Sequence, residues 1–110
     1  MTHTDFCDQW LAAWTGNQPE KLLTFYDENA FYLDPAQPKG LKGHAEIRPY
    51  FEKLLSWRPD WSWKRLEIFP TEKGFTLKWE AKIPTAGEVV TKIGVDIVEL
   101  KDGKIVRNEV

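Results

Sequence analysis

Apolar residues recur every three or four positions near the start of the chain. This spacing predicts an amphipathic helix over Asp5–Trp14, capped by Thr4 or Asp5 and ended by Gly16 and Asn17. The apolar stripe either forms core or lines a ligand site, and core is favoured because a helix packed on a sheet always has such a stripe. The stripe comprises Phe6, Cys7, Trp10, Leu11 and Trp14.

The pattern predicts two more helices. A short one begins at Gln18–Glu20 with Pro19 in its first turn, and a longer one spans about Gly43–Ser56. Pro49 lies inside the longer pattern, so it either bends that helix or moves its start later. The short helix carries Leu22, Leu23, Phe25 and Tyr26, and the long one turns Ile47, Tyr50, Phe51, Leu54 and Leu55 inward.

Between these helices the sequence predicts one strand and one loop. Phe31–Pro35 is a short strand that proline stops, and Ala36–Lys42 is a loop that leads into the long helix. After the long helix, Trp61–Ile68 has apolar residues that a regular strand would divide between two faces. A bulge near Lys64 and Arg65 brings them to one face.

The rest of the chain alternates with a period of two, which predicts strands. Phe75–Ile83 is the clearest of them, and a hairpin turn at residues 84–87 joins it to a long strand over Val89–Val98. A final strand covers Ile105–Val110, and because its pattern does not stop, we expect a few further residues in the natural protein. Helices followed by an antiparallel meander predict one α+β domain over residues 1–110, with three helices packed on one face of a curved sheet.

Asp96 is a carboxylate inside a strand whose residues are apolar on both faces. Burying an unpaired carboxylate costs several kcal/mol, so this side chain must find a partner, stay protonated or line a cavity. A lysine such as Lys92 or Lys78 is one possible partner. Asn108, on the predicted inner face of the last strand with Val106 and Val110, either satisfies Asp96 or fixes a ligand carbonyl.

Composition narrows the function classes. The chain has 110 residues and a net charge of -2, with its lysines and arginines scattered, which argues against nucleic acid or anionic lipid as a partner. One cysteine excludes an internal disulfide, and two histidines give no cluster for a metal, so we predict no metal and no cofactor. The first residues resemble no signal peptide and no apolar run is long enough to span a membrane, which predicts a cytoplasmic protein without a membrane partner.

Six tryptophans in a chain of this length point to an aromatic pocket for an apolar small molecule. Trp63 and Trp79 fall on the predicted concave face.

The opposite face of the Asp96 strand is too apolar for water, which predicts a homodimer formed through the sheet. That face carries Val89, Ile93, Val95 and Ile97, with Leu66 or Ile68 beside them if the bulge lies elsewhere.

The order of elements, with Phe25–Pro35 ending in Asp-Pro and followed by Gly43–Phe51, resembles the SnoaL-like branch of the nuclear-transport-factor-like superfamily. The resemblance spans nearly the whole chain and implies a cone-shaped fold with an internal pocket. It is specific for the fold and weak for the chemistry, because related proteins include isomerases, cyclases, hydrolases and proteins without known activity.

Within that superfamily the ketosteroid isomerases imply roles for two carboxylates. Asp34 is similar in position to their general base, and Asp96 is similar in position to the protonated acid that donates to their enolate oxygen. Where these isomerases present a tyrosine hydroxyl, this chain has Trp10, whose indole N–H is a weaker donor. Tyr32 or Tyr50 can supply the hydroxyl instead. Asp34 can also have a purely structural role, because an Asp-Pro pair often opens a turn and the aspartate caps backbone donors.

The resemblance implies a small-molecule enzyme that moves a proton next to a carbonyl group, in isomerisation or in cyclisation of the polyketide-cyclase type. The catalytic candidates are Asp34 and Asp96. A hydrolase relay of the limonene-epoxide-hydrolase type needs an arginine between two aspartates, and Arg48, Arg65 and Arg107 are poorly spaced for it. The competing prediction is a non-catalytic module that binds an apolar metabolite. The predicted substrate-binding residues are Trp10, Trp14, Tyr32, Tyr50, Trp63, Trp79 and Asn108.

Overall fold

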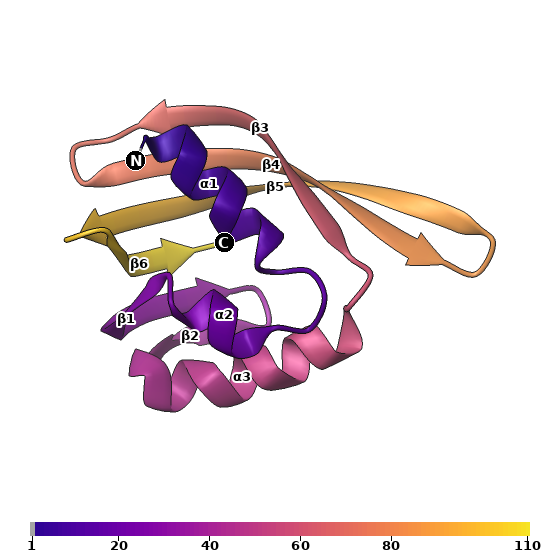
Figure 1. The fold of residues 1–110 in the computed structure, drawn as a ribbon, viewed down its shortest axis with the longest axis horizontal. Helices are drawn as coiled ribbons and strands as arrows, with labels where there is room; N and C mark the ends of the chain where they lie inside the picture. Colours follow the sequence, from indigo (N-terminus) through magenta and orange to yellow (C-terminus); the bar gives the residue numbers. More distant parts are fainter. Residues whose placement is uncertain (1) are drawn as a thin grey trace.

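The computed structural model describes residues 2–110, which form three helices and six strands (Figure 1). A Thr2 side chain that accepts from the backbone N–H of Asp5 begins the first helix, two residues earlier than the sequence pattern predicts. The helices are α1 (His3–Ala12), α2 (Pro19–Leu23) and α3 (Gly43–Trp57). The strands are β1 (Tyr26–Asp34), β2 (Gln37–Lys42), β3 (Ser62–Pro70), β4 (Gly74–Thr85), β5 (Glu88–Lys101) and β6 (Lys104–Glu109).

The six strands form one sheet in the order β2-β1-β6-β5-β4-β3. Strands β1 and β6 pair in parallel, whereas the other neighbours are antiparallel, so the sheet is mixed rather than wholly antiparallel as predicted. Local alternation carries no signal for this pairing, because β1 and β6 lie far apart in the sequence. The parallel pair joins the hairpin β1–β2 to the meander β3–β6.

Three helices cover one face of the curved sheet, which confirms the predicted α+β class. Helix α1 packs against β3, α3 packs against β1 and β2, and α2 packs against α3 (Figure 1). The buried stripe of α1 predicted from the sequence, including Trp10 and Trp14, belongs to the core. The far end of the β4–β5 hairpin projects beyond this body (Figure 1).

Two predictions around β1 and β2 are wrong. Tyr26 begins β1 instead of ending the short helix, and the predicted loop Ala36–Lys42 contains β2. Pro38 and Gly40 gave that segment the appearance of a loop, but β2 is an edge strand, where a proline needs no hydrogen-bonded partner on its outer side. Helix α3 begins at Gly43 and continues through Pro49, so a later start is also wrong.

Register shifts decide which side chains face inward on β3 and β6. The shift in β3 falls between Arg65 and Glu67, one residue later than the predicted bulge. A shift between β5 and β6 leaves Val106 without a paired residue. Ile105 therefore takes the inner place predicted for Val106, and Asn108 remains fully buried.

Within residues 2–110, no helix combines the length and apolar character needed to cross a membrane.

Candidate functional site

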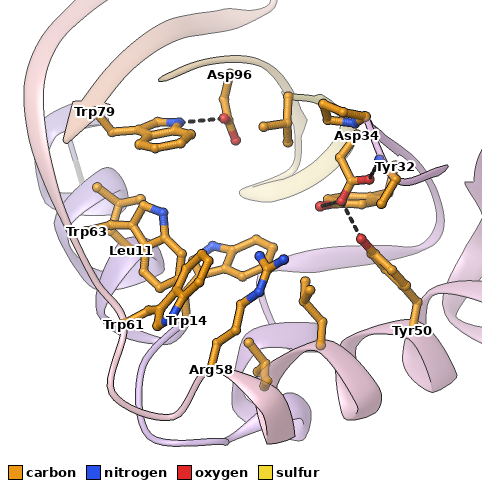
Figure 2. Close-up of a pocket in the computed structure, with 15 residues that line it drawn as sticks. Leu11, Trp14, Tyr32, Asp34, Tyr50, Arg58, Trp61, Trp63, Trp79 and Asp96 are labelled. Atoms are coloured by element: carbon orange, nitrogen blue, oxygen red, sulfur yellow. Dashed lines mark hydrogen bonds between the residues drawn. The ribbon is translucent and has the colours of Figure 1, made fainter. Parts of the chain in front are cut away.

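A cavity of about 320 Å³ lies between the sheet and the carboxyl-terminal ends of α1 and α3 (Figure 2). Its wall is mainly apolar, with two carboxylates from the sheet and one guanidinium from the segment after α3. The lining residues are Leu11, Trp14, Tyr32, Asp34, Pro35, Ala36, Tyr50, Leu54, Leu55, Arg58, Trp61, Trp63, Trp79, Asp96 and Val110.

Asp96 reaches the cavity from β5 and is only 4% exposed. The indole Nε1 of Trp79 donates to its Oδ1 at 2.7 Å, and the amide Nδ2 of Asn108 donates to its Oδ2 at 2.9 Å (Figure 2 shows the first). Burial raises the pKa of Asp96 to about 6, the two hydrogen bonds oppose that rise, and the charge of Asp34 adds to it. Asp96 pairs with no lysine of the described chain, and Lys78 pairs with Glu67.

A chain of buried hydrogen bonds holds the amide of Asn108 in one orientation. Trp10 Nε1 donates to the Tyr26 hydroxyl at 3.3 Å, and that hydroxyl donates to Asn108 Oδ1 at 2.8 Å. The amide NH₂ of Asn108 must therefore point toward Asp96. Of the two roles left open for Asn108, the structure shows the one that satisfies Asp96. Tyr26 was missed as part of this network, because its position was assigned to a helix.

Asp34 ends β1 and accepts four hydrogen bonds. The hydroxyls of Tyr32 and Tyr50 both donate to its Oδ2 at 2.7 Å. The backbone N–H groups of Ala36 and Gln37 donate to Oδ1 at 2.8 and 2.9 Å. Asp34 thus caps the turn after β1 and also lines the cavity, and its role as a general base stays a prediction.

The two carboxylates differ in how many acceptor positions remain open. An ionised carboxylate offers about four lone-pair positions. The protein already fills four at Asp34, but fills only two at Asp96. Asp96 can therefore accept a further proton or hydrogen bond from the cavity, whereas Asp34 is held as an acceptor by its own surroundings.

Aromatic rings form one wall of the cavity. The ring centroids of Trp14 and Trp63 are 6.1 Å apart, and those of Trp61 and Trp63 are 6.0 Å apart. Trp79 continues this wall toward Asp96 (Figure 2). Trp61 was not among the residues predicted for the site, although it shares the alternation with Trp63 that pointed to the concave face. Trp10 lies behind the wall, fully buried in the core.

Arg58 follows α3 and supplies the only guanidinium among the described lining residues. Its Cζ atom lies 4.2 Å from the centroid of the Trp61 ring. Among the ion pairs of residues 2–110, none includes Arg58. The sequence pattern did not single out this residue, because it lies between the predicted helix that ends at Ser56 and the predicted strand that begins at Trp61.

The arginines considered for a hydrolase relay lie away from the cavity lining. Arg48 pairs with Glu20, and Arg65 pairs with Asp8. Arg107 pairs with glutamates on β5 and β6. Within the described part of the chain, no group of three or more histidine, cysteine or acidic side chains is placed to hold a metal ion.

One of three comparisons with known proteins identifies a family, and another shows the fold. The family model described as "SnoaL-like domain" matches residues 7–108. A search against curated protein sequences gave no match. Solved structures with low sequence identity share the fold over nearly the whole chain.

One of these structures is a protein of ketosteroid-isomerase-like fold from Catenulispora acidiphila, crystallised with trimethylamine. It is 17% identical to this chain with a TM-score of 0.81, and the match covers 98% of this chain and 85% of that one. A second is a candidate isomerase of the SnoaL-like family from Agrobacterium tumefaciens, with 21% identity, a TM-score of 0.76 and coverage of 97% and 93%. A third is SalBIII, an epoxide hydrolase/cyclase-like enzyme with a role in pyran ring formation in salinomycin, with 17% identity, a TM-score of 0.79 and coverage of 97% and 87%. At these identities the likeness shows the fold.

Proposed function

Since this chain belongs to the SnoaL-like domain family, we propose that it is a small-molecule enzyme in which Asp96 moves a proton next to a carbonyl group of an apolar substrate. The observation that carries this proposal is the setting of Asp96: a carboxylate on a cavity wall, held by two N–H donors, with acceptor positions left open. Structural neighbours named as a candidate isomerase and as a cyclase-like enzyme support the reaction class.

In the proposed reaction, Asp96 removes a proton from the carbon beside the carbonyl. The electrons of the C–H bond form an enolate, and the protonated Asp96 returns the proton to a second carbon in an isomerisation. In a cyclisation, the enolate carbon attacks the carbon of another carbonyl of the same molecule, and the protonated Asp96 gives its proton to the alkoxide oxygen that forms. A pKa raised to about 6 supports this role, because a general base is most effective when its pKa lies near the working pH.

This assignment gives Asp96 the role of base that the ketosteroid isomerases imply for Asp34. Asp34 as the base stays a prediction, but its four hydrogen bonds favour a role in fixing Tyr32 and Tyr50 at the cavity wall. A cavity of about 320 Å³ is near the lower end of the range for ligand sites, which is about 300–1,000 Å³. We therefore favour a substrate of one or two rings.

Deuterium exchange tests the proposal. The protein is incubated in D₂O with 2-tetralone, a bicyclic ketone, and NMR follows the loss of protons at the α-carbons above the uncatalysed rate. We expect Asp96→Asn to abolish the acceleration. Asp102→Asn, a matched change in the exposed turn between β5 and β6, should leave it unchanged. An Asp96→Asn variant that folds and exchanges as fast as the parent protein would rule out the proposal.

A non-catalytic binding module is the second candidate, and one observation favours it. The hydroxyl protons of Tyr32 and Tyr50 both point to Asp34, so neither is directed at a substrate carbonyl. This candidate predicts that 2-tetralone binds, that binding survives both Asp34→Asn and Asp96→Asn, and that the α-protons exchange no faster than in buffer.

A further inference from the structure

We propose that Arg58 binds a carboxylate group of the ligand, so that the cavity takes small aromatic or alicyclic acids in preference to neutral molecules of the same shape. The inference rests on the proposed function only in taking this cavity as the ligand site. It concerns which ligands bind and does not depend on any reaction. The starting point is the guanidinium of Arg58 in the cavity wall.

The charge of Arg58 has no protein partner in the described chain. An arginine can donate five hydrogen bonds, and its fork matches a carboxylate in a two-point contact. The other arginines of α3, β3 and β6, namely Arg48, Arg65 and Arg107, each donate to an acidic side chain. Arg58 forms no such pair, although it shares the cavity wall with two carboxylates.

Neither cavity carboxylate pairs with Arg58 in the described chain. The acceptor positions of Asp34 are filled by two hydroxyls and two backbone N–H groups. Asp96 is held by Trp79 and Asn108. Figure 2 shows the guanidinium reaching into the space below Asp34 and Asp96, on the side of the cavity away from β5. An acidic group of a ligand can therefore contact Arg58 while its apolar part lies along the tryptophan wall.

The backbone around Arg58 is held in place. The backbone N–H of Trp61 donates to the carbonyl of Arg58 at 3.2 Å, and the hydroxyl of Thr15 donates to the carbonyl of Trp61 at 2.8 Å. The N–H of Gly16 donates to the carbonyl of Pro59 at 3.0 Å. The stacked Trp61 ring restricts the guanidinium itself. A positioned arginine loses less freedom on binding than a mobile one, which favours a recognition role.

The test compares 2-naphthoate with 2-naphthamide, which has the same shape but no charge. Titration calorimetry measures both affinities, and the NMR signals of the indole N–H groups report whether the probes reach the tryptophan wall. We expect the parent protein to bind the acid roughly tenfold or more tightly, and to lose part of this preference as salt concentration rises. Arg58→Met, which keeps an apolar stem, should remove the preference, whereas Arg58→Lys should keep part of it.

Arg48→Met is the matched control, because Arg48 pairs with Glu20 on the outer surface and its loss should leave the preference unchanged. Equal affinity of the parent protein for acid and amide, a preference for the amide, or no binding of either probe at millimolar concentration would overturn the inference. The same holds for a folded Arg58→Met variant that keeps the full preference. Preferential binding of the acid without exchange of 2-tetralone protons would contradict the proposed reaction and leave this inference standing.

Discussion

The indole ring of Trp79 packs against Gly94, the residue directly opposite it on β5. A Cβ atom at position 94 would come within 2.1 Å of Trp79 Cζ2. Glycine at this position therefore provides the space that the indole occupies when its Nε1 donates to Asp96 at 2.7 Å. A residue outside the cavity lining thus helps to set the hydrogen bonding of the carboxylate within it.

Replacing Gly94 with alanine should disturb Asp96 at a distance. The added methyl group forces the Trp79 ring to move, which costs about 1–3 kcal/mol of folding stability. Loss of the indole hydrogen bond, which lowers the pKa of Asp96 in the parent protein, should raise that pKa above about 6. NMR titration of the side-chain carboxyl groups measures the shift.

Trp79→Phe tests the same relationship without a clash, because it removes the N–H and keeps a ring. It should raise the pKa of Asp96 in the same direction as Gly94→Ala. If the pKa stays near 6 in both variants, the indole N–H does not affect the pKa of Asp96.

The ionisation of Asp96 should also affect the pH dependence of folding stability. Its pKa is raised from 3.8 in the unfolded chain to about 6 in the folded protein. Between these values the folded state holds a proton that the unfolded state has lost, so stability falls as pH rises from about 4 to 6. The pKa shift corresponds to about 3 kcal/mol in the free energy of unfolding. The protein has this stability in full below pH 4 and has lost it above pH 6.

Denaturant unfolding at a series of pH values isolates this contribution when the parent protein is compared with Asp96→Asn. The variant has no titrating group at this position, so its stability relative to the parent should improve by up to about 3 kcal/mol between pH 4 and pH 7. Asp102→Asn serves as the control and should show no such trend. A constant difference between parent and Asp96→Asn across this range would mean that Asp96 is not buried as the structure has it.

Asp34 should control the ionisation of the tyrosine beside it. Burial raises the pKa of Tyr50, and the hydrogen bond to Asp34 and the charge of Asp34 raise it further. Asp34→Asn removes the charge and weakens the hydrogen bond, so the pKa of Tyr50 should fall while remaining above its usual value because of burial. Alkaline titration of the tyrosine absorbance, compared with a Tyr50→Phe variant, follows this group. An unchanged pKa would show that Asp34 and Tyr50 do not interact in solution.

The alternation of apolar residues was sufficient to predict β4, β5 and the inward direction of Asp96, because each of these depends on which face of one strand a residue occupies. It was not sufficient for β2, where Pro38 and Gly40 suggested a loop, or for the parallel pairing of β1 with β6. Both depend on partners that lie far away in the sequence.

The same distinction applies to the site. Asp96 was identified as a cavity candidate from its local context, and Asp34 from the resemblance to the ketosteroid isomerases. Their different hydrogen bonding was not predicted, since it depends on contacts with Tyr50, Trp79 and Asn108 across the fold. Arg58 had no local signal at all: a charged residue after a helix is ordinary, and only the folded chain brings it to the tryptophan wall.

The outer face of β5 leads to the last prediction, which is that the protein is a homodimer formed through this face. Val89, Ile93, Val95 and Ile97 are 61%, 56%, 49% and 38% exposed, and they lie on the side of the strand opposite Asp96. The helices pack on the other side of the sheet. The free end of the β4–β5 hairpin, which carries Val89, projects beyond the body (Figure 1).

A two-stranded projection is only marginally stable alone, and an apolar patch of roughly a few hundred Å² is near the limit that monomers tolerate. Burying that patch against a second copy would contribute on the order of 25 cal/mol per Å² before the cost of association, enough for a moderate dimer. Sedimentation at micromolar concentration should therefore give twice the mass of 12.8 kDa. Ile93→Lys should shift the protein to a monomer, whereas Thr71→Lys, in the exposed turn between β3 and β4, should not. A parent protein that sediments as a monomer would mean that this face remains open to water or receives a different partner.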